Sequence, residues 1–353
     1  MSVLDTAPRP TVSTPSLPVA GAILRAEAEE VGDIWAPSRE CAAFLAYARR
    51  RNSVKAMTTS ARTPDGAAHT PSGALILDGN VLRNYIVAEV HRQVSQLPTT
   101  PCLATVLIGN DGPSQVYVRN KHRQAQLAGM TSRNETLPAD VSQRDAQARI
   151  TALAEDPAVS GIIVQQPVPA HLDGEALLAL IPVEKDVDGL TTASMGRLMR
   201  GAESLVPCTP LGVLRLLEHY GAVTAGKRAV VVGRSSLVGL PLAVLLSRKG
   251  VDATVTLAHS RTANLVEVCR AADILVSATG QARSIRAEHV KPGAWVIDVG
   301  ISRGEQGIVG DVSFDDVQSV AAAITPMPGG TGPMTVACLI ENTLTAWRRQ
   351  HRG

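Results

Sequence analysis

The chain has 353 residues and a formal net charge of +2 at neutral pH, with 45% hydrophobic and 19% charged residues. This length favours two domains, and the composition is that of a globular protein. Because aromatic residues make up only 3% of the chain, its cores must be built mainly from Ala, Val, Leu and Ile. So small a net charge favours neither nucleic acid nor anionic lipid, and we expect a small-molecule partner.

The cysteines and the hydropathy pattern indicate an ordinary soluble protein. The five cysteines are scattered and form no Cys-x-x-Cys pair, which argues against a disulfide framework and against a zinc site, so no metal is expected. No apolar run approaches the roughly 20 residues that span a bilayer, and the proline-rich start lacks the apolar region of a signal peptide. We therefore expect a cytoplasmic protein.

Residues 1–72 differ in composition from the rest of the chain. Pro, Ser, Thr and Ala dominate at the start, and turn-forming residues return before residue 73. Helical stretches lie between, over residues 23–54. We expect a poorly ordered extension; the alternative is a small docked helix pair anchored by Trp35 and Phe44. Met57 is an alternative translation start.

From residue 73 onward, apolar strand-like runs alternate with helical patterns, which is typical of βα units around a parallel sheet. No repeat of solenoid length occurs, so the sequence predicts an α/β fold of the open doubly wound kind. The clearest predicted strands cover residues 102–108, 161–165, 228–232, 254–258, 274–278 and 295–299.

One predicted strand leads into a glycine-containing turn that is typical of nucleotide binding. The run 229–232 is followed by a turn that holds Gly233 and Gly239, and then by a helix through Leu246. Glycines let the backbone approach a pyrophosphate, whose charge is met by N–H groups at the helix N-terminus. The spacing differs from G-x-G-x-x-G, so a tight turn without a ligand stays open as an alternative.

The residues after the next predicted strand favour NADP over NAD. They read His-Ser-Arg-Thr over 259–262, without the Asp or Glu that NAD enzymes usually place against the ribose hydroxyls. Guanidinium and hydroxyl donors suit a 2'-phosphate instead. Arg234 and Ser260 are the main predicted phosphate ligands, and Arg261 is a weaker one.

Tyr117 and Lys121 are four residues apart in a predicted helix and so share one face. A lysine beside a phenol in a partly desolvated cleft can transfer protons near neutral pH. Short-chain dehydrogenases also use Tyr-x-x-x-Lys, but after their nucleotide-binding glycines, whereas here it comes about 110 residues before them. That class is disfavoured and is the runner-up among oxidoreductases.

Three further segments identify a family by resemblance: Val-Gln-Gln-Pro at 164–167, Pro-Val-Glu-Lys-Asp-Val-Asp-Gly at 182–189 and Thr-Pro-Met-Pro-Gly-Gly-Thr-Gly-Pro-Met-Thr at 325–335. With the segments at 196–198 and 207–210 and the Gly-Arg-Ser turn, their order and spacing resemble the bifunctional methylenetetrahydrofolate dehydrogenase/methenyltetrahydrofolate cyclohydrolase family. The resemblance runs from about residue 73 to the C-terminus. Gln166 stands where the family usually has Leu, and Thr331 where Val or Ile is commoner, which affects the expected fine geometry of the site.

The resemblance implies a fold of two α/β domains with a cleft between them. Residues 73–208 would form the folate-binding catalytic domain, completed by the C-terminal helix within 330–353, and residues 209–329 a Rossmann-like NADP-binding domain. Such enzymes are usually homodimers. Tetrahydrofolate one-carbon compounds are the implied partners, and neither nucleic acid nor membrane is expected.

The resemblance also implies which residues form the sites. The implied catalytic residues are Tyr117, Lys121, Gln165 and Asp188. The implied folate-binding residues are Tyr117, Asp188, Pro328, Gly329 and Gly330. The implied cofactor-binding residues are Gly233, Arg234, Ser235, Gly239, Ser260, Arg261, Ile301 and Thr335.

The implied function is oxidation of 5,10-methylenetetrahydrofolate with NADP, followed by hydrolysis to 10-formyltetrahydrofolate. In this interpretation Lys121 carries protons, Gln165 fixes its amino group, and Asp188 accepts from the pterin N–H groups while Tyr117 stacks on the folate. The alternatives are a catalytically silent folate- or nucleotide-binding paralogue and another NADP-dependent dehydrogenase. The presence of both Lys121 and Asp188 favours an active enzyme.

Overall fold

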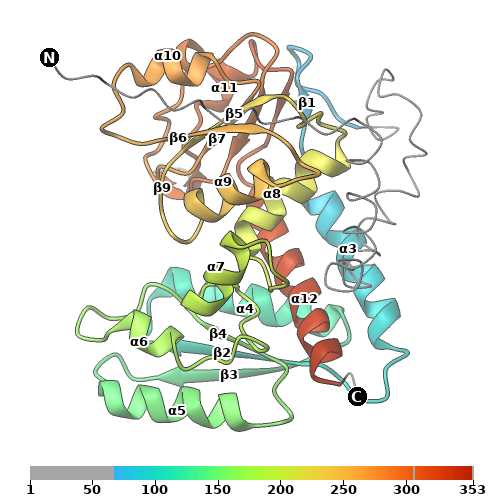
Figure 1. The fold of residues 1–353 in the computed structure, drawn as a ribbon, viewed down its shortest axis with the longest axis vertical. Helices are drawn as coiled ribbons and strands as arrows, with labels where there is room; N and C mark the ends of the chain where they lie inside the picture. Colours follow the sequence, from blue (N-terminus) through green and yellow to red (C-terminus); the bar gives the residue numbers. More distant parts are fainter. Residues whose placement is uncertain (1–66, 305–306, 352–353) are drawn as a thin grey trace, which may run out of the picture. The chain divides into compact units, whose positions relative to one another are not determined.

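A computed structural model describes residues 67–304 and 307–351, whose strands form one three-stranded sheet, one six-stranded sheet and one two-stranded hairpin (Figure 1). Most of the predicted N-terminal extension, including the helical stretches over 23–54 and Met57, lies outside the described residues. Within the described part of the chain, no helix combines the length and the apolar character that crossing a membrane requires.

The three-stranded sheet has β2 (Cys102–Ile108) at its centre, between β3 (Thr131–Leu137) and β4 (Gly161–Val164), with all strands parallel. All seven residues of β2 are buried, because helices cover both faces of the sheet. On one face α5 (Gln143–Glu155) packs against alternate β2 residues such as Val106, and on the other α4 (Gly112–Leu127) shares a cluster with Leu103 (Figure 1).

The six-stranded sheet is also parallel throughout, in the order β1-β11-β8-β7-β5-β6. After β5 the chain adds β6 on one side and then β7 on the other, so the strand order reverses at β5. In open α/β sheets, ligands bind at the carboxyl ends of the strands beside such a reversal. The bounds of its strands are β1 Leu75–Ile76, β5 Arg228–Val232, β6 Thr254–Ala258, β7 Ile274–Ser277, β8 Trp295–Asp298 and β11 Ala323–Ile324.

The remaining elements connect or cover these sheets. Strands β9 (Ser302–Gly304) and β10 (Gly307–Val309) form the antiparallel hairpin. The short helical elements are α6 Gly174–Leu178, α7 Thr192–Met199, α9 Gly239–Ser247, α10 Leu265–Arg270, η1 Ala287–His289 and α11 Phe314–Val317.

Three long helices pack together between the two sheets (Figure 1). The C-terminal helix α12 (Thr331–Gln350) packs along both α8 (Cys208–His219) and α3 (Gly79–Val94). Their buried side chains form a single hydrophobic cluster that includes Leu103 of β2 and Val231 of β5. Apolar packing along α12 therefore joins the two sheets into one core.

All six predicted strands are confirmed, and each ends within one residue of its expected position. The parallel α/β architecture and a C-terminal helix are confirmed as well. Strand β3 was not predicted, because it lies at the sheet edge and only Leu137 among its seven residues is buried. A strand exposed on both faces lacks the apolar run by which the other strands are recognised.

The start of β4 lies so close to the loop before Asp188 that a Cβ at Gly161 would overlap the Val187 side chain. Val187 is fully buried and has nowhere to move. We predict that Gly161→Ala lowers the free energy of unfolding by about 1–3 kcal/mol, the usual cost of overpacking. Urea denaturation followed by circular dichroism measures this change.

Gly196 in α7 is the matched control, since no atom lies within 4 Å of the position of its Cβ. Gly196→Ala should leave the stability unchanged or raise it by up to about 1 kcal/mol, because Ala favours helix more than Gly does. Equal effects of the two substitutions would contradict the close approach at Gly161.

Candidate functional site

A side-chain hydrogen bond joins two of the predicted catalytic residues. Lys121 lies in α4, which follows β2, and Gln165 directly follows β4, the neighbour of β2 in the sheet. The Lys121 Nζ atom donates to Gln165 Oε1 over 3.0 Å, and Gln165 Nε2 in turn donates to the backbone oxygen of Gln166 over 2.8 Å. Both side chains are half-buried. The Lys121 amino group is thereby held at the carboxyl end of the sheet.

Asp188 lies within electrostatic reach of Lys121. Burial raises the pKa of the Asp188 carboxyl above its usual value, while the positive charge of Lys121 acts in the opposite direction. The structure thus brings Lys121, Gln165 and Asp188 together, although they are up to 67 positions apart in the sequence. A base, a hydrogen-bonding amide and a carboxylate in one site can move a proton and bind an amidine-like edge.

The loop that carries Asp188 is held by the C-terminal helix. Asn342 of α12 donates its side-chain amide to the backbone oxygens of Val187 at 2.8 Å and Val206 at 3.0 Å. Gly189 has a φ of 70°, and a Cβ there would lie 2.6 Å from the Pro207 nitrogen. Only glycine fits both requirements, so the turn after Asp188 is closely specified.

Tyr117 lies one helical turn before Lys121 and is 37% exposed. Burial raises the pKa of its phenol, and the positive charge of Arg303 in β9 opposes that rise. Arg303 of the β9–β10 hairpin therefore lies within electrostatic reach of the phenol, which no pattern in the sequence suggested.

The segment with Pro328, Gly329 and Gly330 packs against the first turn of α3. Gly79 donates its N–H to the backbone oxygen of Gly329 over 2.8 Å, and a Cβ at Gly79 would overlap the Gly330 oxygen. Next along the chain, the buried Thr331 hydroxyl donates to the backbone oxygen of Asp298 over 2.8 Å. The threonine that departs from the family pattern thus has a hydrogen-bond partner of its own.

The glycine turn after β5 packs closely against other backbone segments of the chain. Gly233 has a φ of 124°, and a Cβ there would overlap the backbone oxygen of Ala278. A Cβ at Gly239 would overlap the Gly233 oxygen. Helix α9 begins at Gly239 without a side-chain cap. In its first turn the Leu240 N–H donates to the Ser235 backbone oxygen over 3.1 Å and Pro241 has no N–H, so of these three residues only Gly239 can offer an N–H to an anion.

The predicted 2'-phosphate ligands lie after neighbouring strands. Strands β5 and β6 pair Val232 with Ala258, and the Gly233 N–H donates to the Ala258 oxygen over 2.8 Å. The two residues on which the phosphate prediction depends, Arg234 and Ser260, therefore follow adjacent strand ends. Arg234, Ser235, Ser260 and Arg261 are all exposed. A phosphate can therefore reach them from solvent.

The other two predicted cofactor residues lie after β8 and in α12. Ile301 is 45% exposed, so its apolar side chain is accessible to a bound ring. The Thr335 hydroxyl is 3.0 Å from that of Thr209 in α8.

Models of two protein domains match the chain: the catalytic domain of tetrahydrofolate dehydrogenase/cyclohydrolase over residues 77–188, and its NAD(P)-binding domain over residues 207–351. The chain belongs to the tetrahydrofolate dehydrogenase/cyclohydrolase family. Together the two matches cover most of the chain and all the predicted site residues.

Relatives and solved structures agree with this assignment. The bifunctional protein FolD 2 of Frankia alni is 53% identical over 279 residues, which make up 78% of this chain and 96% of that protein. The bifunctional FolD methylenetetrahydrofolate dehydrogenase/cyclohydrolase of Campylobacter jejuni is 39% identical, with a TM-score of 0.76 over 80% of this chain and 99% of that one. The Trypanosoma brucei enzyme, solved with NADP and an inhibitor, is 40% identical, with a TM-score of 0.76 over 79% and 99% of the two chains.

Two buried carboxyl groups were not predicted from the sequence. Asp298 ends β8 and Asp311 follows β10, and their exposed fractions are 2% and 0%. A carboxylate at the end of the apolar run Trp-Val-Ile-Asp was the signal that could have found Asp298, since such groups are rarely buried without a purpose. Asp311 stands in a short Gly-Asp-Val segment that offers no comparable signal.

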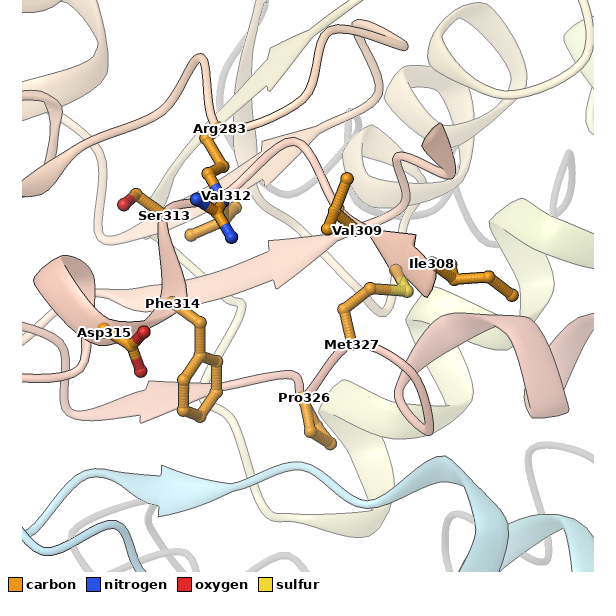
Figure 2. A pocket seen from close by; sticks show the side chains of 10 residues that line it. Arg283, Ile308, Val309, Val312, Ser313, Phe314, Asp315, Pro326 and Met327 are labelled. Carbon is orange, nitrogen blue, oxygen red and sulfur yellow. The ribbon is translucent and has the colours of Figure 1, made fainter. Parts of the chain in front are cut away.

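A cavity of about 300 Å³ lies elsewhere in the six-stranded half of the molecule (Figure 2). Phe314, Pro326, Met327 and Ile308 line it together with Arg283. None of the predicted catalytic or cofactor residues lines this cavity. In the part of the chain that the structure describes, no cluster of His, Cys, Asp and Glu could hold a metal ion, and Cys102, Cys208, Cys269 and Cys338 are buried free thiols.

Burial raises the pKa of Asp298 to about 6, with a further contribution from the charge of Asp311, against the hydrogen bonds from the backbone N–H groups of Val312, Asp311 and Gly300. Between its ordinary value of 3.8 and about 6, the native protein holds a proton that the unfolded chain has lost. The stabilising contribution of this group is therefore complete below about pH 4 and is lost as the pH rises to about 6.

We predict that Asp298→Asn removes this titration. The free energy of unfolding of the variant, minus that of the wild type, should then increase by up to about 3 kcal/mol from pH 4 to pH 6. Urea denaturation at a series of pH values measures the difference between the two proteins. The exposed Asp140→Asn serves as the control and should show no such trend. A pH-independent difference for Asp298→Asn would mean that the carboxyl is already ionised at pH 4.

Proposed function

We propose that this chain oxidises 5,10-methylenetetrahydrofolate to 5,10-methenyltetrahydrofolate with NADP and then hydrolyses the product to 10-formyltetrahydrofolate. The observation that carries the proposal is the contact of Lys121 with Gln165 beside Asp188, in a chain that matches both domains of the family. The residue roles below, and the domain boundaries at 73–208, 209–329 and 330–353, are parts of the same proposal. So are a homodimer and a cytoplasmic location.

The turn after β5 fits a dinucleotide. A Cβ at Gly233 or Gly239 would overlap a backbone oxygen, so glycine at both positions keeps the turn tight, and the Gly239 N–H at the start of α9 can donate to a pyrophosphate oxygen. Arg234 and Ser260, at the ends of adjacent strands, would hold the 2'-phosphate. When bound, NADP supplies the nicotinamide carbon that accepts a hydride.

In the oxidation step the task of the protein is alignment. The methylene carbon bridges two folate nitrogens and loses a hydride, a transfer that depends on close and dry placement of the two rings rather than on an acid or base. Asp188 would accept hydrogen bonds from the pterin N–H groups, and Tyr117 would stack on the folate. Pro328, Gly329 and Gly330 would form part of the wall of the folate site.

In the hydrolysis step a proton must move. Water adds to the methenyl carbon, and the adduct loses and regains protons while the ring opens. Lys121 is the proton carrier in this proposal, and its 3.0 Å hydrogen bond with Gln165 fixes the position of the amino group. Asp188 adds a second polar group within electrostatic reach.

The first test of the proposal is an absorbance assay for methenyl formation, in which a catalytically silent paralogue would form no product.

We predict that Lys121→Met lowers the rate of methenyl hydrolysis at least about 100-fold while folate binding is retained, because proton transfer typically contributes that much. The decay of methenyl absorbance without NADP measures the rate. Lys249→Met, which removes an exposed lysine outside the site, should hydrolyse at the wild-type rate. Hydrolysis by Lys121→Met at a rate near that of the wild type would remove Lys121 from its proposed role.

We predict that the wild type uses NADP about 100-fold more efficiently than NAD, since two charge-assisted phosphate contacts of this kind account for such a ratio. Replacing Arg234 by Ala and Ser260 by Asp should sharply lower NADP use and spare or improve NAD use, because the new carboxylate repels phosphate and accepts from ribose hydroxyls. The ratio of kcat/KM for the two cofactors is the measurement. If that ratio is equal in the wild type, or does not move in the double variant, the phosphate site has been misplaced.

A further inference from the structure

The proposed chemistry leaves unused the carboxyl pair formed by Asp298 and Asp311. Asp298 is the last residue of β8, at the carboxyl edge of the six-stranded sheet, Asp311 follows β10 of the hairpin, and both are buried. Burying two carboxyl groups side by side is costly unless each has hydrogen-bond donors or a shared proton. What each carboxyl group contacts therefore indicates why it is there.

Asp311 binds the chain segment that follows β7. Its Oδ2 atom accepts hydrogen bonds from Ser277 Oγ at 3.1 Å, Thr279 N at 2.6 Å and Gly280 N at 3.2 Å. Three donors converge on one oxygen, while Oδ1 accepts none from the part of the chain that the structure describes. The carboxylate of Asp311 thus determines the course of residues 277–280.

That segment packs directly against the glycine turn. The Ala278 backbone oxygen occupies the space into which a Cβ of Gly233 would project. Any shift of residues 277–280 therefore changes the contact with Gly233, although Asp311 is 78 positions away from Gly233 in the sequence.

Asp298 fixes Asp311 and the segment after β8 together. Its Oδ1 atom accepts from Gly300 N at 2.9 Å and Asp311 N at 3.0 Å, and its Oδ2 atom accepts from Val312 N at 2.9 Å. Each carboxyl group also fills the space beside a glycine that is close to the other carboxyl group in the sequence. A Cβ at Gly300 would overlap the Asp311 carboxylate, and a Cβ at Gly310 would overlap that of Asp298.

We propose that Asp311, held in place by Asp298, is a positioning residue for the cofactor: it binds the segment 277–280 and so sets the three strand ends, at Gly233, Ala278 and Gly300, against which NADP binds. This inference rests on the proposed function, because the place of NADP does. Asp311 acts as a buried acceptor of backbone hydrogen bonds and need not touch the cofactor. Its loss is expected to affect NADP more than folate, whose proposed ligands lie on other elements.

The test compares Asp311→Ala with Asp311→Asn in the full chain. Alanine leaves the three donors unpaired, whereas asparagine keeps one acceptor oxygen for them. We expect Asp311→Ala to raise the KM for NADP at least about tenfold, and Asp311→Asn to stay within about threefold of the wild type. Hydrolysis of methenyltetrahydrofolate, assayed without NADP, should be unchanged in both variants.

A smaller change tests the same contact if Asp311→Ala does not fold. Ser277→Ala removes one of the three donors, and the KM for NADP should then rise about two- to threefold. Ser247→Ala is the matched control, since this exposed hydroxyl donates to the Val244 backbone oxygen of its own helix. If Asp311→Ala does not fold, the KM values for NADP of Ser277→Ala and Asp311→Asn decide whether Asp311 positions the cofactor.

Three results would overturn the inference: an unchanged KM for NADP in Asp311→Ala and Ser277→Ala, equal losses of oxidation and hydrolysis, or failure of Asp311→Asn to retain NADP binding. The last would assign the effect to charge rather than to the acceptor. A wild type that does not oxidise methylenetetrahydrofolate with NADP would instead refute the proposed function, so the two failures can be told apart.

Discussion

The packing of α12 against α3 and α8 is the interaction on which the rest of the structure depends. The three helices contribute to one hydrophobic cluster that reaches residues of both sheets, such as Leu103 and Val231. Removing this cluster from water supplies the main driving force for holding the two halves together. Lys121 and Gln165 belong to the half with the three-stranded sheet and Arg234 and Ser260 to the half with the six-stranded sheet, so this apolar contact is also what brings their chemistry into one molecule.

Both proposed sites follow from the same property of parallel sheets. Because all strands of a parallel sheet end at one edge, residues that follow different strands become neighbours without any sequence proximity. Gln165 follows β4 and meets Lys121 of the helix after β2, while Arg234 and Ser260 follow β5 and β6. Side chains that follow the strands lie beyond the backbone ladder of the sheet and can bind ligands.

The strands and the glycine turn were predictable from the sequence because their signals are local. An apolar run such as that of β2, or the glycines at 233 and 239, expresses its structure within a few residues. Strand β3 was missed because its side chains face solvent, and a solvated edge strand has no characteristic pattern. The roles of Lys121 and Asp188 came from resemblance to a family. The charge effect of Arg303 on Tyr117 and the hydrogen bonds of Asn342 with Val187 and of Asp298 with the backbone of Asp311 depend on the tertiary fold, and no spacing in the sequence indicates them.

Helix α12 carries contacts to both halves along one rigid segment. Thr331 at its start binds the backbone of Asp298, and Asn342, eleven positions later, binds the backbone beside Asp188. A single residue inserted between them would rotate one contact relative to the other by about 100° and shift it by about 1.5 Å. The number of residues between these two positions is therefore fixed by geometry. Over the evolution of this fold, changes in length are expected to accumulate in surface connections and to be excluded from this helix.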